Sequence, residues 1–136
     1  MAESTQHAAL VNIIIRHIQR NYADVPGLGL LSDLSGPLHC ERPNRIEGFV
    51  PDVQALDAPL TTMILGEAKT PDDLETSRSI DQITAFLSYL SFQPRPVFIL
   101  GVSWHDRARA ESLVARIKQQ LGAHSVRTQT LTDIGM

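Results

Sequence analysis

The sequence predicts an α/β fold in which a mixed central sheet is flanked by helices. Two observations carry this prediction. Apolar residues recur at helical spacing in three segments, and the chain between these segments holds short runs that alternate in polarity or are continuously apolar, as strands do. With 136 residues, 43% of them hydrophobic, the chain is long enough to bury a core, so we expect residues 1–136 to form a single domain.

The first expected element is an amphipathic helix over residues 5–22. Apolar side chains recur there every three or four positions, and polar side chains occupy another face. Residues 24–36 contain one proline and three glycines, which favours a loop that ends the helix. A first strand is expected over residues 37–41, followed by a turn.

The next two expected strands cover residues 46–56 and 62–69. The first of them is expected to bulge near Gly48 and Pro51, because proline has no N–H to donate to a neighbouring strand. The short connection between the two strands predicts that they are antiparallel neighbours.

The second half of the chain predicts a crossover. A helix is expected to begin near the acidic segment 70–73 and to end before Pro94, with its apolar residues between 80 and 90. The continuously apolar run at 96–104 is typical of a strand buried on both faces. A third helix over 106–121 and an edge strand over 125–131 complete an order of helix, three strands, helix, strand, helix, strand.

Three charged residues lie inside the expected strands, where an unpaired charge costs several kcal/mol. Because side chains alternate along a strand, Glu67 and Lys69 share one face, and Asp52 on the neighbouring strand is expected beside Glu67. Two adjacent carboxylates repel each other unless a cation or a proton neutralises them. Only oxygen ligands are near in sequence, so the expected cation is Mg²⁺ or Mn²⁺ rather than zinc, and the backbone carbonyl of Ala68 is a further candidate ligand.

This arrangement suits hydrolysis of a phosphodiester. A divalent cation between carboxylates can orient a phosphate and activate water, and Lys69 lies within reach of such a water. A structural reading also exists: Lys69 neutralises one acid and solvent screens the other. The shared face of the three side chains favours the catalytic reading.

The residues resemble the PD-(D/E)xK nuclease superfamily, which includes many restriction endonucleases, Holliday-junction resolvases and DNA-repair nucleases. Pro51-Asp52 matches the "PD" and Glu67-Ala68-Lys69 the "ExK", 15 positions later. The resemblance implies a restriction-endonuclease-like αβββαβ core, a metal held by Asp52, Glu67 and the Ala68 carbonyl, and cleavage of DNA, including branched or structured DNA. It also implies a site role for Gln82 on the following helix and, by analogy with resolvases and restriction enzymes, a homodimer.

Other residues are candidates for the surroundings of this site. The first helix lacks the acidic residue that resolvase-like members add, so Glu41 and Glu47 are the possible further acids. The possible phosphate contacts are Arg42, Arg45 and Arg78. Trp104 and His105 either stack on a base or close the edge of the core, and we favour the second reading for the tryptophan. The histidines at positions 7, 17, 39 and 124 show no ligand spacing and are assigned no role.

Composition limits the alternatives. A formal net charge of −3 and a pI near 5.9 disfavour a protein that coats nucleic acid by charge alone. One cysteine and the lack of a long apolar run predict a cytoplasmic protein with no membrane partner. The "GEAKT" segment lacks the spacing of a phosphate-binding P-loop, so no nucleotide cofactor is expected. The alternative function is a catalytically inactive nuclease-fold module that binds nucleic acid or a protein.

Overall fold

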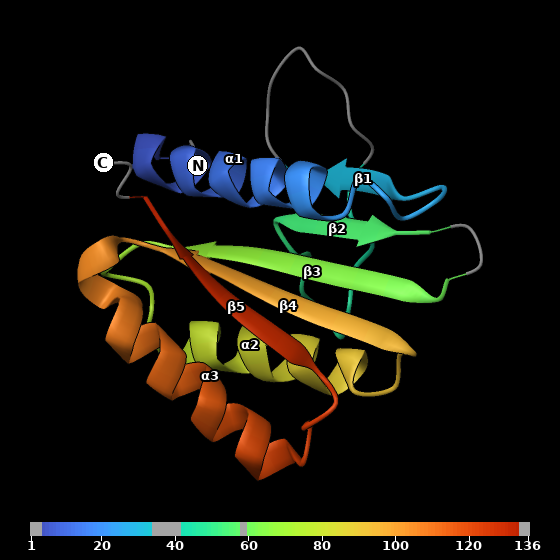
Figure 1. Ribbon diagram of the computed structural model, residues 1–136. Coiled ribbons are helices and arrows are strands. Elements are labelled where there is room, and N and C mark those ends of the chain that lie inside the picture. The colour runs from blue at the N-terminus through green and yellow to red at the C-terminus, as the bar shows by residue number, and fades with distance from the viewer. Residues whose placement is uncertain (1–3, 34–41, 58–59, 134–136) are drawn as a thin grey trace.

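The structure is a computed structural model that describes residues 4–33, 42–57 and 60–133. Figure 1 shows a twisted sheet with helices on both faces. The elements in chain order are α1 (Thr5–Asn21), β1 (Gly29–Ser32), β2 (Val53–Leu56), β3 (Thr62–Lys69), α2 (Ser77–Leu90), β4 (Arg95–Val102), the 3₁₀ turn η1 (Trp104–Asp106), α3 (Arg107–Leu121) and β5 (Arg127–Thr132).

The five strands lie side by side in chain order, β1-β2-β3-β4-β5. The pairs β1–β2 and β2–β3 are antiparallel, whereas β3–β4 and β4–β5 are parallel, each parallel connection passing through a helix. The predicted α/β fold with a mixed sheet flanked by helices is therefore confirmed, as is the antiparallel pairing of the strands at 53–56 and 62–69.

The positions of the first two strands differ from the prediction. The expected strand at 37–41 lies outside the described residues, and β1 instead occupies Gly29–Ser32, which was wrongly predicted to be loop. The two leucines of this segment pair with Ala55 and Gln54, so pairing with β2 overrides the low strand propensity of the flanking glycines.

The expected strand over 46–56 is wrong in its first half. Ile46 and Phe49 close a tight turn in which Glu47 and Gly48 both have positive φ, 49° and 89°. Such a turn cannot continue a ladder, and Pro51 lacks an N–H, so β2 begins only at Val53.

The sheet separates two apolar layers. Alternate residues of β3 face opposite sides, so Met63 and Leu65 pack with α2 and α3 whereas Ile64 and Ala68 pack with α1. All eight residues of β3 are buried, because this strand lies at the centre of the sheet with helices on both faces. Glu67 and Lys69 therefore lie on the α2 face, as the alternation predicts.

Helices α1 and α2 begin at hydroxyl caps. Ser4 accepts a hydrogen bond from the His7 amide at the start of α1, and Thr76 accepts one from the Ser79 amide at the start of α2. The helix start expected at 70–73 is therefore wrong, because those residues form the turns before Thr76. None of the helices in the described ranges is both long and apolar enough to cross a membrane.

Helix α1 approaches the sheet closely because two strand residues lack a side chain. A Cβ on Gly66 would lie 2.7 Å from Cγ2 of Ile14, and one on Gly101 would lie 3.1 Å from Cδ1 of Ile14. The fully buried isoleucine thus fills the space above both glycines. This contact sets the height of α1 above β3 and β4, and therefore the position of the side chains on its first turn.

We expect Gly66→Ala to lower the free energy of unfolding by about 1–3 kcal/mol, because the new methyl group overpacks the contact with Ile14. Urea unfolding of the variant measures this change. Gly29→Ala is the matched control: its Cβ would meet only a backbone oxygen at 3.8 Å, so a change within about 0.5 kcal/mol is expected. Equal losses in both variants would contradict the role of this contact.

Candidate active site

The candidate site lies at the part of the β3 edge that does not pair with β2. The last β2–β3 pair is Val53↔Gly66, whereas β3 continues to Lys69 along β4. The backbone of Ala68 therefore has no partner in β2, and its N–H donates to Oδ2 of Asp52 at 2.8 Å. The N–H and C=O of one strand residue point to the same edge, so the Ala68 carbonyl also faces this side.

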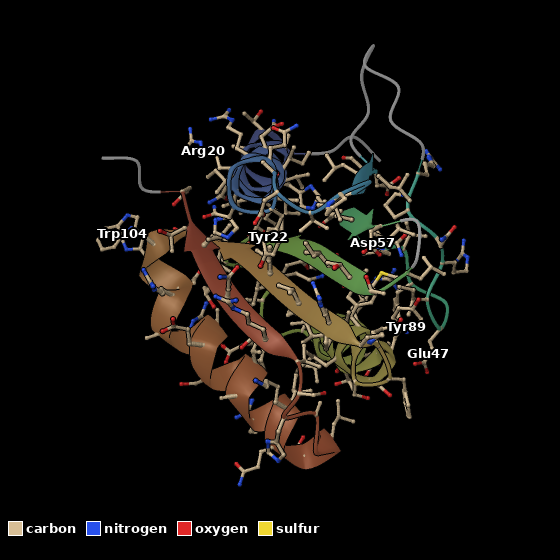
Figure 2. All side chains as sticks on the ribbon, turned by 45° about the vertical axis from the view of Figure 1, so that its right-hand side comes forward. Arg20, Tyr22, Glu47, Asp57, Tyr89 and Trp104 are labelled. Atoms are coloured by element: carbon tan, nitrogen blue, oxygen red, sulfur yellow. The ribbon has the colours of Figure 1, made fainter. Side chains whose placement is uncertain are left out.

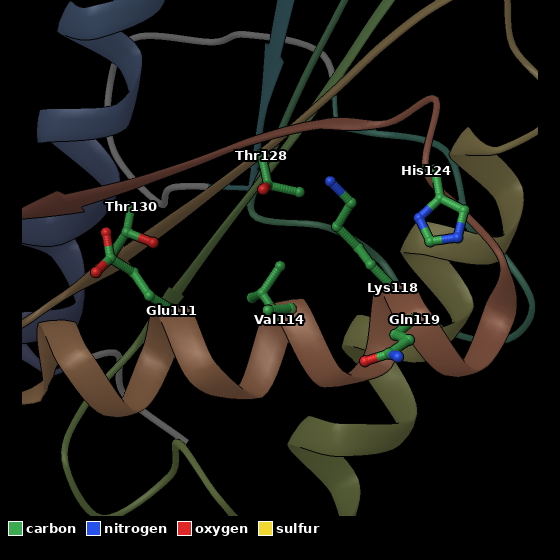
Figure 3. A pocket seen from close by; sticks show the side chains of 8 residues that line it. Glu111, Val114, Lys118, Gln119, His124, Thr128 and Thr130 are labelled. Atoms are coloured by element: carbon green, nitrogen blue, oxygen red, sulfur yellow. The ribbon is translucent and has the colours of Figure 1, made fainter.

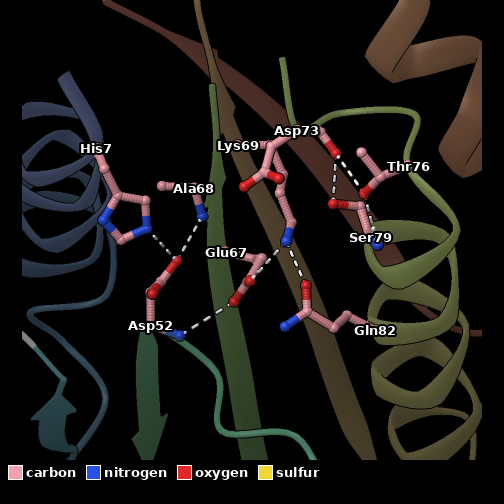
Figure 4. A network of polar contacts seen from close by, with 9 residues as sticks. All are labelled: His7, Asp52, Glu67, Ala68, Lys69, Asp73, Thr76, Ser79 and Gln82. Carbon is pink, nitrogen blue, oxygen red and sulfur yellow. Dashed lines mark hydrogen bonds and ion pairs between the residues drawn. The ribbon is translucent and has the colours of Figure 1, made fainter. Parts of the chain in front are cut away.

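Asp52 sits just outside β2 and links three elements (Figure 4). Its Oδ2 accepts the Ala68 amide and lies 3.2 Å from Nε2 of His7 on α1, and its own amide donates to Oε1 of Glu67 at 3.1 Å. The carboxylate therefore occupies the edge of β3 rather than the strand face that Glu67 shares with Lys69. The reason is that β2 begins only at Val53, which leaves the Ala68 N–H to be satisfied by a side chain.

Glu67, Lys69 and Gln82 form a buried polar chain on the α2 face. Nζ of Lys69 lies 3.2 Å from Oε2 of Glu67 and donates to Oε1 of Gln82, which comes from α2. The side chains of Glu67 and Lys69 are only 5% and 6% exposed. Figure 4 shows the ammonium between the carboxylate and the amide, so both of its polar neighbours are held by regular secondary structure.

Burial and the nearby charge of Asp52 raise the pKa of Glu67 to about 8, against the opposing effect of the Lys69 ammonium. One lysine thus does not offset the burial of Glu67 together with the charge of Asp52. An additional positive charge bound beside Asp52 and Glu67 would favour the ionised form of Glu67.

The structure adds His7, to which the sequence assigned no role. The residue lies on the first turn of α1, 45 positions before Asp52, where no spacing rule links the two. The first helix thus brings an imidazole to the site in place of the missing acid. Ser4 fixes the start of this turn, and the packing of Ile14 on the sheet fixes its height.

The possible additional acids do not join the site among the described residues. Glu47 is exposed on its turn, and Figure 2 shows it at the surface. Its positive φ places it at the tip of the turn closed by Ile46 and Phe49. Glu41 lies outside the described residues.

The three arginines predicted to contact phosphates have other partners. Arg42 is 3.5 Å from the carboxylate of Asp33, and Arg45 donates to the carbonyl of Gly48. Arg78 lies over the ring of Phe49, 5.4 Å from its centroid. Each of the three side chains thus contacts a group of the protein itself.

Trp104 does not close the core, so that reading is wrong. The residue is 51% exposed and stacks on His105 with ring centroids 3.9 Å apart. Figure 2 shows Trp104 projecting from the end of the sheet. Lys69 pairs with Val102, two residues before Trp104, so this aromatic pair lies at the same end of the sheet as the candidate site.

The oxygen donors at this edge of β3 come from three residues. Asp52 and Glu67 offer carboxylate oxygens and Ala68 offers a carbonyl, which is the chemistry that Mg²⁺ and Mn²⁺ prefer. Among the described residues, no hydrogen bond holds Oδ1 of Asp52. The same part of the chain contains no cluster of three or more His, Cys, Asp or Glu side chains that could hold a metal. The chemistry of the donors, and not a preformed cluster of side chains, is therefore what fits Mg²⁺ or Mn²⁺, and water or substrate oxygens would fill the remaining positions.

No protein-family model, no curated protein and no solved structure matches the chain.

Proposed function

We propose that this protein is a Mg²⁺-dependent nuclease of the PD-(D/E)xK type, with Mn²⁺ as a substitute metal, that hydrolyses phosphodiester bonds in DNA. The observation that carries the proposal is the buried contact of Lys69 with Glu67 and Gln82 beside Asp52, at an edge where β3 has no strand partner. Burial of an ammonium and a carboxylate at a strand edge costs stability, which a purely structural role explains poorly.

Each residue has a distinct part in this proposal. Asp52, Glu67 and the Ala68 carbonyl hold the cation, which would supply charge for the phosphate oxygens and lower the pKa of a bound water. Lys69 stabilises negative charge that develops on the phosphoryl group, because its ammonium is fixed in a site of low polarity. Gln82 orients that ammonium, and His7 orients the carboxylate of Asp52.

The proposal also includes the fold and the oligomeric state. The restriction-endonuclease-like core is proposed from the element order and the PD…ExK spacing. A homodimer is proposed because cleavage of both strands, or of a branched junction, needs two sites.

The test of this function is cleavage of labelled linear, nicked, flapped and four-way DNA by the purified chain with Mg²⁺ or Mn²⁺, repeated with chelator. Asp52→Asn and Glu67→Gln are expected to abolish cleavage, whereas Glu47→Gln, which removes an exposed carboxylate, is expected to leave it unchanged. Absence of metal-dependent cleavage on every substrate would contradict the proposal.

A second candidate is a catalytically inactive module with the same fold, which binds nucleic acid or a protein. The contacts of Lys69 with Glu67 and Gln82 favour it, because the ammonium has polar partners within the protein itself. This candidate predicts that the isolated chain binds its partner equally well after Asp52→Asn and that chelator has no effect.

We expect Gln82→Leu to lower the rate of cleavage about 10-fold while the protein stays folded. The leucine fills a similar volume on α2 but leaves the Lys69 ammonium without an acceptor that fixes its direction. Single-turnover cleavage measures the effect. The control is Gln120→Leu, on the exposed face of α3, for which an unchanged rate is expected. A rate for Gln82→Leu equal to that of the control would remove Gln82 from the site.

A further inference from the structure

We propose that the α1 side of the β5 edge binds the phosphate backbone of the nucleic acid. This inference rests on the proposed function for the class of its ligand. The surface, called here the edge arginines, consists of Arg16, Arg20, Arg95 and Arg127.

Acidic and basic residues are unevenly distributed along the chain. Residues 22–81 contain 11 Asp and Glu against 4 Lys and Arg, whereas residues 82–132 contain 2 against 6. Helix α1 has two arginines and no acid. Since the strands lie in chain order, the acidic segment forms the β1–β3 part of the sheet and the basic segment the β4–β5 part. A polyanion that approaches the candidate site is therefore attracted from the β5 side.

Two of the edge arginines line one cavity at the start of the parallel strands. Val97 packs on the α1 face of the sheet, and Arg127 is its partner in the β4–β5 register. Arg95 lies two residues before Val97 in β4 and therefore points to the same face. Both side chains line a cavity of about 360 Å³, together with Tyr22 and the hydroxyl-bearing residue Ser125. Carboxylates are absent from its lining, so an anion between the two guanidinium groups meets donors of one sign.

The other two edge arginines lie one helical turn apart on α1. Arg16 and Arg20 line a second cavity of about 240 Å³ against Thr132 and its neighbour in β5. His17 fixes the helix on this strand, because its Nε2 lies 3.0 Å from Oε1 of Gln129. This lining also lacks a carboxylate.

None of the edge arginines forms an ion pair with an acid in the described ranges. The exposed arginines at the start of α3 differ, since Arg107 pairs with Glu111, and Arg109 with Glu75 and Asp106. The four arginines are exposed and line two cavities without a carboxylate, so their like charges repel each other, and a phosphate backbone would remove this repulsion.

The spacing between this surface and the candidate site suits a nucleic acid. Arg20 follows His7 by 13 positions on α1, which at 1.5 Å per residue places it about 20 Å from the turn that contacts Asp52. That length corresponds to about six nucleotides of a duplex strand. A DNA arm that runs along α1 from the edge arginines thus reaches the site, whereas a small phosphate ligand does not connect the two.

The opposite side of β5 provides an internal comparison. A cavity of about 490 Å³ between α3 and β5 is lined by Lys118 and Thr128, but also by the carboxylate of Glu111 (Figure 3). Lys118, from this lining, and Arg116, exposed on the same helix, are two cations outside the edge arginines. A change of both to glutamate alters the net charge as much as the same change at two edge arginines.

The experiment measures binding of a fluorescein-labelled duplex of about 24 base pairs by anisotropy, with chelator present so that no cleavage occurs. Arg95→Glu with Arg127→Glu is expected to raise the Kd about 10-fold or more and to reduce the slope of log K against log salt by about 1–2. Arg116→Glu with Lys118→Glu is expected to change the Kd less than about 3-fold, since its effect acts only through net charge. Arg95→Lys with Arg127→Lys should keep most of the affinity.

Equal weakening by the two glutamate pairs, or weakening by neither, would overturn the inference. Inorganic phosphate that displaces the duplex at millimolar concentration from wild-type protein, with no effect on the edge variant, would also overturn it in favour of a small-anion site. Far-UV circular dichroism checks folding, and Arg95→Ala with Arg127→Ala replaces the glutamate pair if the latter unfolds.

Different outcomes contradict the DNA-binding surface and the nuclease activity. Wild-type protein that binds DNA through the edge arginines but never cleaves it would overturn the nuclease and keep the surface. Wild-type protein that cleaves DNA, with an unchanged KM after Arg95→Glu and Arg127→Glu, would overturn the surface and keep the nuclease.

Discussion

Lys69→Met is expected to lower metal-dependent cleavage by about 10²–10³-fold. The methionine side chain occupies nearly the same volume, so the packing under Gln82 is kept while the charge is lost. The ammonium contacts Glu67 and Gln82 at the site, and no other cation of the described residues is in contact with Glu67. In the proposed nuclease, loss of this charge removes stabilisation that the transition state needs more than the bound substrate does. Single-turnover cleavage at saturating enzyme measures the effect.

The control for this prediction is Lys118→Met, which alters the other lysine of the chain. Lys118 lines the cavity between α3 and β5, and its removal is expected to change the rate less than about 2-fold. Glu67→Gln combined with Lys69→Met tests folding, because this pair leaves no charge at either position. A Lys69→Met protein that keeps more than about a tenth of the activity would show that the lysine has a structural role only.

We expect the apo protein to lose stability as the pH rises from about 4.5 to about 8. The pKa of Glu67 is raised from 4.5 to about 8 by burial and by the charge of Asp52. Between these values the folded protein keeps a proton that the unfolded chain has released, so the slope of stability against pH is negative. The contribution is complete below about 4.5, where both states are protonated, and is lost as the pH passes about 8.

Urea unfolding at several pH values measures this dependence. Glu67→Gln is expected to reduce the loss between pH 5 and 8.5 by about 1–3 kcal/mol, whereas Glu47→Gln, at an exposed turn, should leave it unchanged. Mg²⁺ is expected to reduce the loss in the wild type but not in Glu67→Gln, since a cation favours the ionised carboxylate. Identical slopes for all three proteins would contradict the proposed cause.

The sequence predicted the central part of the fold because alternation and apolar runs are strong there. Glu67 and Lys69 were placed on one face of β3 by the period of two alone, and the buried run that became β4 was recognised from its continuous apolarity. The helices were found from their apolar spacing. These elements depend on local patterns, which one sequence displays.

The parts that escaped prediction depend on contacts between distant segments. The strand at Gly29–Ser32 forms because β2 pairs with it, and its glycines hide this in the sequence. Asp52 was expected on a strand face, but the length of β2 is set by Pro51 and by the turn before it. The contact of His7 with Asp52 follows from the way α1 packs on Gly66, which no motif encodes.

Because the β2–β3 ladder ends at Gly66, the amide of Ala68 can report on the state of the site. The N–H of Ala68 is held by the carboxylate of Asp52 and not by a backbone carbonyl, so its hydrogen exchange depends on a side chain that can be protonated, mutated or recruited by a ligand. Amides deeper in β3 are held by β2 or β4 and exchange only when the sheet opens. One resonance in an NMR spectrum thus follows the state of the site separately from the stability of the fold.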